Sequence, residues 1–320
     1  MVQPENLRTV FMGTPEFALQ TLEGLLSSGV NLVGVYTQPD RPKGRGKKLA
    51  ASPVKKLAIE YEIPVFQPQK LRDPLAVAEL QTLQPDLIVV VAYGQILPKV
   101  VLDIPNYHCI NVHASLLPKY RGAAPINKAI IDGETETGVT TMLMDVGLDT
   151  GDMLVKHSLT IGANEPAGQL HDRLALLGRK AMEETLKQLC SGTLTAEKQV
   201  DALSCYAPML KKEDGLIDWR RTATEIHNQV RGLDPWPGAY TYLDDEVLKI
   251  ASTTLAAGST EAPGTIISAD KTGVQIACGE GVLIVGELQL PGRKRLSAMN
   301  FLSGRPLFPG SLLGECKGDS

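Results

Sequence analysis

The first half of the chain alternates short apolar runs with segments whose apolar residues recur at helical spacing. An apolar run over 7–12 ends in Gly13-Thr14-Pro15, and apolar residues then recur at roughly helical spacing as far as Gly29. Six consecutive apolar residues at 87–92 indicate a strand that is buried on both faces. The alternation predicts an α/β fold with a doubly wound, mostly parallel sheet. Further strands are expected at 30–37, 108–113, 138–144 and 153–159, and helices at 53–62, 73–83, 123–131 and 170–189.

The pattern changes after the long helix expected at 170–189. That helix should stop near Ser191-Gly192, and the polar residues that follow have the composition of a linker. From Ile217 onward, one short helix is followed by short strands separated by Gly and Pro, which predicts a small β-barrel. These expected strands are 238–243, 247–251, 264–268, 273–277 and 282–289. We therefore expect a first domain over 1–192, a linker over 193–207 and a second domain over 208–320.

Three turns should border one site, because the carboxyl ends of parallel strands gather at one edge of the sheet, where ligands bind. These turns are Gly13-Thr14-Pro15, Ala92-Tyr93-Gly94 and the segment 111–115. The first lacks the Gly-x-Gly-x-x-Gly spacing that lets a backbone approach a pyrophosphate. We therefore expect it to shape the pocket floor or simply to form a tight turn, and not to bind a nucleotide.

Asn111 and His113 are the residues at this edge that best suit chemistry. Residues i and i+2 of a strand share a face, so these two side chains can converge on one target while Val112 packs behind them. An amide can donate to a developing oxyanion, and a histidine can exchange a proton near neutral pH. The alternative is that both are polar residues that cap a strand without any chemical role.

A carboxylate that orients the imidazole would complete the set. Asp149 is the preferred candidate because glycines flank its loop, whereas Asp145 and Asp152 lie at the loop margins. Ser115 lies nearby but lacks the Gly-x-Ser-x-Gly setting of a hydrolase serine. Direct transfer between two substrates is therefore expected, and not an acyl-enzyme.

Composition is that of an ordinary globular protein, with 43% hydrophobic and 21% charged residues among 320. No apolar run approaches the ~20 residues that would cross a bilayer, and the start does not have the pattern of a secretory signal, so we expect a cytoplasmic protein with no membrane partner. The five cysteines have no paired spacing, which argues against a disulfide framework or a zinc site. No HExxH pattern is present, and we expect no metal.

Two local clusters of positive charge stand out against a formal net charge of −4. A nucleic-acid partner would have to bind such a cluster, although the simpler interpretation of each is a solvated loop. The first cluster comprises Arg41, Lys43, Arg45, Lys47 and Lys48, and the second comprises Arg293, Lys294 and Arg295.

The motifs N-V-H-A-S-L-L-P-K-Y-R-G and M-D-V-G-L-D-T-G-D resemble those of the 10-formyltetrahydrofolate-dependent formyltransferases. The resemblance extends over nearly the whole chain, through F-M-G-T-P-E-F-A, T-Q-P-D-R-P-K-G-R-G-K-K-L, V-V-A-Y-G-Q-I-L-P and W-P-G-A. It implies a Rossmann-like formyltransferase domain followed by an OB-like barrel that binds tRNA.

The resemblance also implies roles for individual residues. Asn111, His113 and Asp149 match the family's catalytic trio, and the basic loop around Arg45 matches the segment that enters the tRNA acceptor end. The implied folate site is formed by Ser115, Leu116, Leu117, Pro118, Val91, Ala92, Tyr93, Gly94 and the loop that begins at Asp145.

Within the family, the chain resembles the members that formylate methionine carried on initiator tRNA. This implies 10-formyltetrahydrofolate as co-substrate and initiator methionyl-tRNA as partner, and we expect a monomer. One alternative is a formyltransferase for a small amine acceptor, either phosphoribosylglycinamide or an amino sugar nucleotide. Another is a non-enzymatic RNA-binding protein on a Rossmann-like scaffold.

Overall fold

The computed structural model describes residues 2–43 and 48–314, and these form two compact units that are not continuous in sequence. The first unit contains Met1–Gly122, Thr137–Leu159 and His171–Tyr206, and the second contains Ala123–Glu136, Thr160–Leu170 and Ala207–Ser320. Two short segments before residue 192 thus pack with the C-terminal part of the chain. The expected boundaries at 192 and 208 describe continuous domains and remain a prediction.

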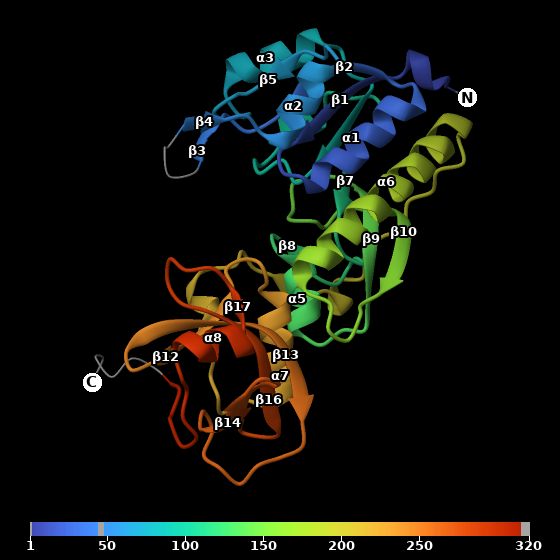
Figure 1. Cartoon of the computed structure of the whole chain (residues 1–320). Coiled ribbons are helices and arrows are strands. Elements are labelled where there is room, and N and C mark those ends of the chain that lie inside the picture. The colour runs from blue at the N-terminus through green and yellow to red at the C-terminus, as the bar shows by residue number, and fades with distance from the viewer. Residues whose placement is uncertain (1, 44–47, 315–320) are drawn as a thin grey trace. The chain divides into compact units, whose positions relative to one another are not determined.

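A seven-stranded sheet forms the centre of the first unit (Figure 1). Its spatial order is β10 (Met153–Thr160), β9 (Glu136–Leu143), β7 (Cys109–His113), β6 (Leu87–Val91), β1 (Arg8–Gly13), β2 (Asn31–Tyr36) and β5 (Val65–Phe66). The five strands from β7 to β5 pair in parallel, whereas β9 runs antiparallel to β7. The order reverses between β1 and β6, and ligand crevices of such sheets lie at this kind of switch point.

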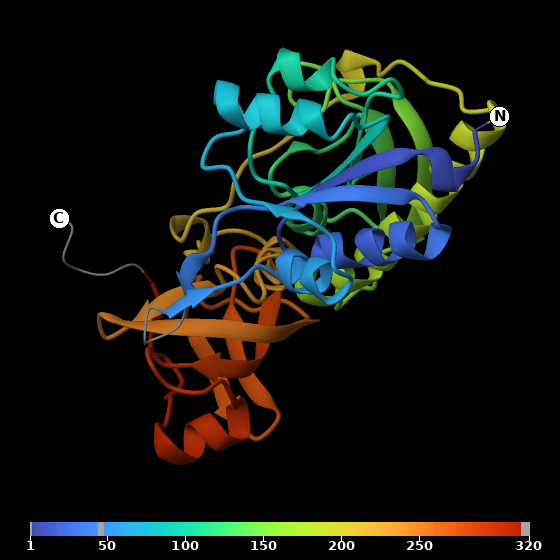
Figure 2. The ribbon, with the colours of Figure 1, turned by 90° about the horizontal axis from the view of Figure 1, so that it is seen from above.

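Helices cover both faces of this sheet, as Figure 2 shows from above. On one face lie α1 (Phe17–Ser28) and α2 (Pro53–Glu60), and α6 (Ala167–Ser191) packs beside α1. On the other lie α3 (Pro74–Thr82) and α4 (Lys99–Leu102), whose apolar residues share a buried cluster with β1 and β6. The predicted doubly wound fold is confirmed.

Local sequence accounts for much of this arrangement. All five residues of β6 are buried, and removing each large apolar side chain from water contributes about 1.5–3 kcal/mol. Ser52 and Asp73 accept backbone N–H bonds at the starts of α2 and α3, and proline occupies the first position of each helix. A Cβ at Gly13 would lie 2.9 Å from that of Ala18, so glycine permits the close turn from β1 to α1.

The short elements complete the chain. They are the 3₁₀ helices η1 (Pro4–Asn6), η2 (Asp201–Leu203) and η3 (Glu213–Gly215), the strands β3 (Arg41–Lys43), β4 (Lys48–Ala50), β8 (Arg121–Gly122) and β11 (Tyr206–Ala207), and the helix α5 (Pro125–Ile131). Within the described residues, no helix is both long and apolar enough to cross a membrane.

The second unit contains an antiparallel sheet that closes into a barrel. The sheet order is β12 (Ala239–Leu243), β13 (Glu246–Ala256), β16 (Val282–Gln289), β15 (Gly273–Ala277) and β14 (Ile266–Asp270), and β17 (Leu296–Ser297) pairs with β16. The segment 311–314 bonds to both edge strands, through Tyr242 of β12 and Ile266 of β14. This segment thus connects the two edge strands, and the predicted barrel is confirmed. The helices α7 (Ala223–Gly232) and α8 (Ala298–Gly304) pack against this sheet.

The second unit contains a buried histidine, His227, that should make the stability of the folded protein depend on pH. His227 of α7 donates from Nε2 to the Ala163 carbonyl at 3.1 Å, and its Nδ1 lies 2.8 Å from the Thr253 hydroxyl. Burial lowers the pKa of His227, and the positive charge of Arg231 lowers it further. A lowered folded-state pKa means that protonation favours the unfolded chain. His227 thus contributes stability above about pH 6.5, and this is lost as pH falls below that value.

We expect the parent to lose more stability than His227→Gln when the pH is lowered from 7.5 to 5.5. One proton contributes at most about 1.4 kcal/mol per pH unit to the difference. Denaturant unfolding of both proteins at several pH values measures it, and the other histidines cancel because both proteins contain them. If the free energies of unfolding of the two proteins differed by the same amount at every pH, this prediction would be contradicted.

Candidate active site

Strand β7 presents Asn111 and His113 on one face and Val112 on the other. A Cβ at Gly178 of α6 would lie 3.1 Å from Val112 Cγ1, so Val112 packs toward α6. The alternation of a strand then directs Asn111 and His113 to the opposite face. Asn111 aligns with Val90 of β6, which places it close to the switch point of the sheet.

The His113 ring is buried, with 5% of the residue exposed. Its Nε2 lies 2.9 Å from the Tyr120 carbonyl oxygen, and because a carbonyl only accepts, this nitrogen carries the hydrogen. Its Nδ1 lies 3.7 Å from Asp149 Oδ2, which is longer than a hydrogen bond. The expected orienting carboxylate is therefore not the direct partner of the ring. Tyr120 holds the ring, and Asp149 places a negative charge beside Nδ1.

Asp149 reaches this position by an indirect route. Because β9 is antiparallel to β7, Leu143 pairs with Ile110 and the Met144 N–H bonds to the Cys109 carbonyl, so the loop that follows starts beside the beginning of β7. Asp149 adopts a left-handed backbone with φ of 53°, and its Oδ2 accepts the Gly122 N–H at 2.8 Å. Asp145 is exposed and accepts the Thr150 hydroxyl at 2.7 Å, which braces the loop from within.

The Asn111 side chain differs from its neighbours in having no hydrogen-bond partner in the part of the chain that the structure describes. It is half-buried, and no hydrogen bond joins its amide to any residue in the described ranges 2–43 and 48–314. Its donor hydrogens point to the same face as the His113 ring. The amide can therefore bind an oxygen of a ligand without breaking a bond that the fold needs.

The turn after β7 is held from inside the protein. Ser115 is buried and its hydroxyl donates to the Lys119 carbonyl at 2.6 Å, while Thr140 Oγ1 accepts the Leu117 N–H at 3.1 Å. Leu117 is also buried, whereas Leu116 and Pro118 are partly exposed. Of the four residues predicted to line the folate site here, two thus have side chains engaged in the turn. The Ser115 carbonyl and the Leu117 N–H are both bonded to Thr140, so the partly exposed Leu116 and Pro118 are the residues of this turn that a ligand can reach.

Hydrogen bonds join the turns after β1, β2 and β6. The Tyr93 carbonyl accepts from the Thr14 hydroxyl at 2.9 Å and from Gln38 Nε2 at 3.3 Å. Val91 and Tyr93 are buried, while Ala92 and Gly94 are exposed and have positive φ. Burial raises the pKa of the Tyr93 hydroxyl above its ordinary value. Exposed apolar side chains accompany these turns and the loop after β9, namely Ile96, Val146 and Leu148.

The predicted RNA-binding residues lie in two places. Arg41 is exposed, and the register of the β3–β4 hairpin pairs Lys43 with Lys48, whereas Arg45 and Lys47 lie outside the described residues.

The second basic cluster follows β16. Arg293 and Lys294 are exposed, but Arg295 forms an ion pair with Asp234, which raises the pKa of its guanidinium. Of the three positive charges in this cluster, that of Arg295 is therefore balanced by Asp234, while Arg293 and Lys294 are exposed.

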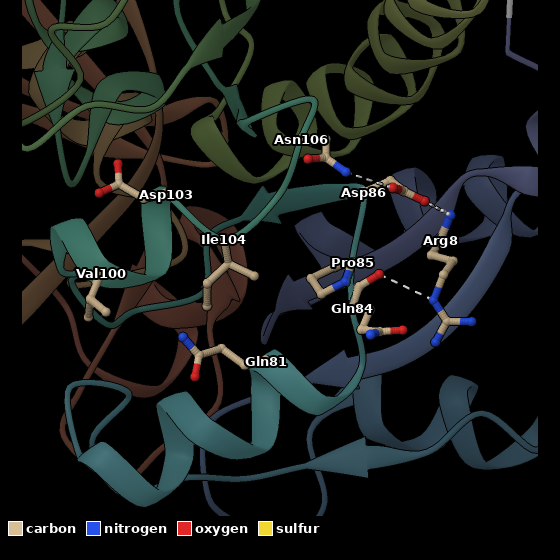
Figure 3. A pocket seen from close by; sticks show the side chains of 9 residues that line it. All are labelled: Arg8, Gln81, Gln84, Pro85, Asp86, Val100, Asp103, Ile104 and Asn106. Carbon is tan, nitrogen blue, oxygen red and sulfur yellow. Dashed lines mark hydrogen bonds between the residues drawn. The ribbon is translucent and has the colours of Figure 1, made fainter.

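A groove of about 770 Å³ lies at the opposite edge of the sheet, beside the amino-terminal ends of its strands (Figure 3). Several polar side chains that line this groove already form hydrogen bonds within the protein. The Arg8 guanidinium donates to the Leu83 carbonyl at 2.7 Å, and Asn106 donates to Asp86 at 3.2 Å. Because it lies at the amino-terminal ends of the strands, the groove is separate from the site at the carboxyl end of β7. In the part of the chain that the structure covers, no group of three or more His, Cys, Asp or Glu could hold a metal ion.

One contributor to this site has no signal in the sequence. Gln199 lies in the segment interpreted as a linker, yet its side-chain amide donates to the carbonyl groups of Asp149 and Gly151, both at 2.8 Å. A single glutamine in a polar stretch has no periodicity or motif that would identify it.

Comparison with known proteins shows which family has this sequence and fold. The profile of the formyl transferase domain matches residues 7–186, and that of the formyl transferase C-terminal domain matches residues 209–306. A methionyl-tRNA formyltransferase from Citrifermentans bemidjiense is 60% identical over 310 residues, covering 97% of each chain. One from Geobacter sulfurreducens is 58% identical, covering 97% of this chain and 98% of its own.

Solved structures agree at the level of the fold. An N-formyltransferase from Helicobacter canadensis, solved with folinic acid and dTDP-3-aminofucose, has a TM-score of 0.69 at 20% identity and covers 92% of this chain and 100% of its own. With its two matched domains and its similarity to relatives over nearly their whole length, the chain belongs to the formyltransferase family, in the group of the methionyl-tRNA formyltransferases.

Proposed function

We propose that this enzyme transfers the formyl group of 10-formyltetrahydrofolate to the amino group of methionine on initiator tRNA, for initiation of translation. The observation that carries the proposal is the arrangement on β7. The Asn111 amide, which has no hydrogen bond to the described residues, shares one face with the buried His113 ring, and Asp149 Oδ2 lies 3.7 Å from His113 Nδ1. The names of the 58–60% identical relatives support the choice of acceptor. We also propose that the enzyme acts as a monomer in the cytoplasm.

The folate donor supplies a formyl carbon that an amine can attack. As the amine nitrogen bonds to that carbon, the formyl oxygen becomes negative, and the Asn111 amide donates hydrogen bonds to it. His113 Nδ1 is the ring atom that is not committed to Tyr120, so it can exchange a proton with the reacting groups. Asp149 balances the charge of the protonated ring. The bond from carbon to the folate nitrogen then breaks, and the proton of the amine passes to that nitrogen directly or through water.

The proposed folate site suits an aromatic ring with polar edges. Exposed apolar side chains at Ile96, Val146 and Leu148 can cover ring faces, and the backbone of the turn at Ala92 and Gly94 can meet ring edges. The remaining residues proposed to border it are Val91, Tyr93, Ser115, Leu116, Leu117, Pro118 and Asp145.

The experiment that tests the acceptor uses labelled formyl groups. Purified enzyme and 10-formyltetrahydrofolate are offered charged initiator tRNA, phosphoribosylglycinamide or an amino sugar nucleotide. We expect the label on methionyl-tRNA alone. The second candidate acceptor is favoured by one observation, the sugar nucleotide bound in the Helicobacter canadensis structure, but at 20% identity that protein shares only the fold. Label on a small amine and none on tRNA would refute the proposed acceptor.

The exposed cluster after β16 gives a prediction about salt. Each lysine that contacts a phosphate releases counterions, so its loss flattens the dependence of log Kd on log salt by about one. We expect Lys294→Gln to weaken binding of methionyl-tRNA and flatten this slope, because Lys294 is exposed. Lys271→Gln, in the turn between β14 and β15, removes the same charge elsewhere and is the control. Equal slopes for the parent and Lys294→Gln would exclude the contact.

A further inference from the structure

The segment 193–206 belongs to the first unit and is fastened beside the proposed active site. Glu197 exchanges both backbone hydrogen bonds with Met153, each 2.8 Å long. At the other end, the Cys205 carbonyl accepts the Arg121 N–H at 2.9 Å, and Cys205 Sγ accepts the Tyr120 N–H at 3.2 Å. Residues between these anchors are therefore held at a defined distance from the loop that carries Asp149.

Gln199 lies between the anchors, and its side chain is fully hydrogen-bonded. Nε2 donates one hydrogen to the Asp149 carbonyl and the other to the Gly151 carbonyl, both at 2.8 Å. Oε1 accepts from Arg121 Nε at 3.0 Å. Arg121 is in turn tied to Asp201 at 2.8 Å. One side chain thus links the Asp149 loop to the turn that holds the His113 ring.

The Asp149 backbone needs such support. Its φ of 53° lies in the left-handed region, which costs a residue other than glycine free energy unless neighbours hold it there. Two groups hold it. Gly122 N–H binds the carboxylate, and Gln199 binds the carbonyl of the same residue. Together they determine where Asp149 Oδ2 lies relative to His113 Nδ1.

We infer that Gln199 is a positioning residue for formyl transfer, which acts by placing the Asp149 carboxylate beside His113. The inference rests on the proposed role of the His113–Asp149 pair. Gln199 itself need not touch either substrate. Its loss would let the loop shift, and a displacement of about 1 Å at a catalytic group can cost ~100-fold in rate.

The test is a double-mutant cycle with Gln199→Met and Asp149→Asn. Methionine keeps the length of the side chain but has neither amide hydrogen. We expect Gln199→Met to lower kcat about 10- to 100-fold, with KM for the folate donor changed less than about threefold. In the Asp149→Asn background, the same change should cost less than about twofold, because the carboxylate it positions is gone. If Gln199 had a purely structural role, Gln199→Met would lower kcat by the same factor in the parent and in the Asp149→Asn variant.

A control variant and two folding checks distinguish a specific effect of Gln199 from general damage to the fold. Glu197→Gln alters the same segment, but its side chain pairs with Lys156, and it should keep the parent kcat. Thermal unfolding and calorimetric binding of folinic acid check that each variant is folded. If Gln199→Met does not fold, Gln199→Glu, which keeps an acceptor for Arg121 but has no amide hydrogen, takes its place in the cycle.

The inference about Gln199 alone would be overturned if Gln199→Met kept the parent kcat, or if it lowered kcat by the same factor in the parent and in Asp149→Asn. An Asp149→Asn variant with the parent rate would instead refute the proposed role of the pair.

Discussion

Asn111→Ala is expected to lower kcat for formyl transfer by about 100-fold or more, the scale observed when one oxyanion donor is lost. The amide has no hydrogen bond to the protein within the described residues, so its removal leaves no partner unsatisfied and should change stability little. The loss should appear in single-turnover formylation of charged initiator tRNA, with folate affinity nearly unchanged.

A matched asparagine serves as the control for this experiment. Asn106 lies at the opposite edge of the sheet, where it binds Asp86 (Figure 3). Asn106→Ala should formylate at the parent rate. If Asn111→Ala also retained nearly the parent rate, Asn111 would have no part in stabilising the oxyanion.

His113→Gln is expected to lower kcat by roughly 10²- to 10⁴-fold, the range attributed to a positioned acid or base. Glutamine can still donate to the Tyr120 carbonyl, which His113 Nε2 reaches at 2.9 Å, so the local fold should survive. What glutamine lacks is a group that exchanges a proton in the place of Nδ1. Pre-steady-state formylation, combined with folinic acid binding, separates the chemical step from folding and affinity.

His157→Gln provides the comparison for the histidine. This residue lies at the surface and contacts Glu184 at 2.9 Å, so its replacement should leave the rate unchanged. A His113→Gln variant that loses folate affinity but not the rate of the chemical step would show that the ring only shapes the pocket.

The architecture of both units was predictable because it depends on local patterns. A strand buried on both faces, such as β6, must be apolar at every position, and a helix on a sheet must repeat its apolar residues. The short elements β3, β5 and β8 were missed, because two or three residues are too few to form a pattern. The closing of the barrel by 311–314 was missed as well, since its partners Tyr242 and Ile266 lie far away in sequence.

The candidate site divides in the same way. That Asn111 and His113 share a face follows from the two-residue period of a strand, and Asp149 could be selected because glycines mark its loop. The direct partner of the ring is the Tyr120 carbonyl, and every residue has such a carbonyl. Gln199 is a similar case, because nothing near it in sequence distinguishes it from other polar linker residues.

The sequence by itself therefore determined the fold class and the two strand residues on which the proposed chemistry depends, since both follow from the local periodicity of strands and helices. Only the tertiary structure decided how those residues are held. The reversed direction of β9, the left-handed backbone at Asp149 and the bonds from Tyr120 and Gln199 all arise from contacts between distant segments. Such contacts are chosen by the packing of the whole unit, and no short stretch of sequence contains them.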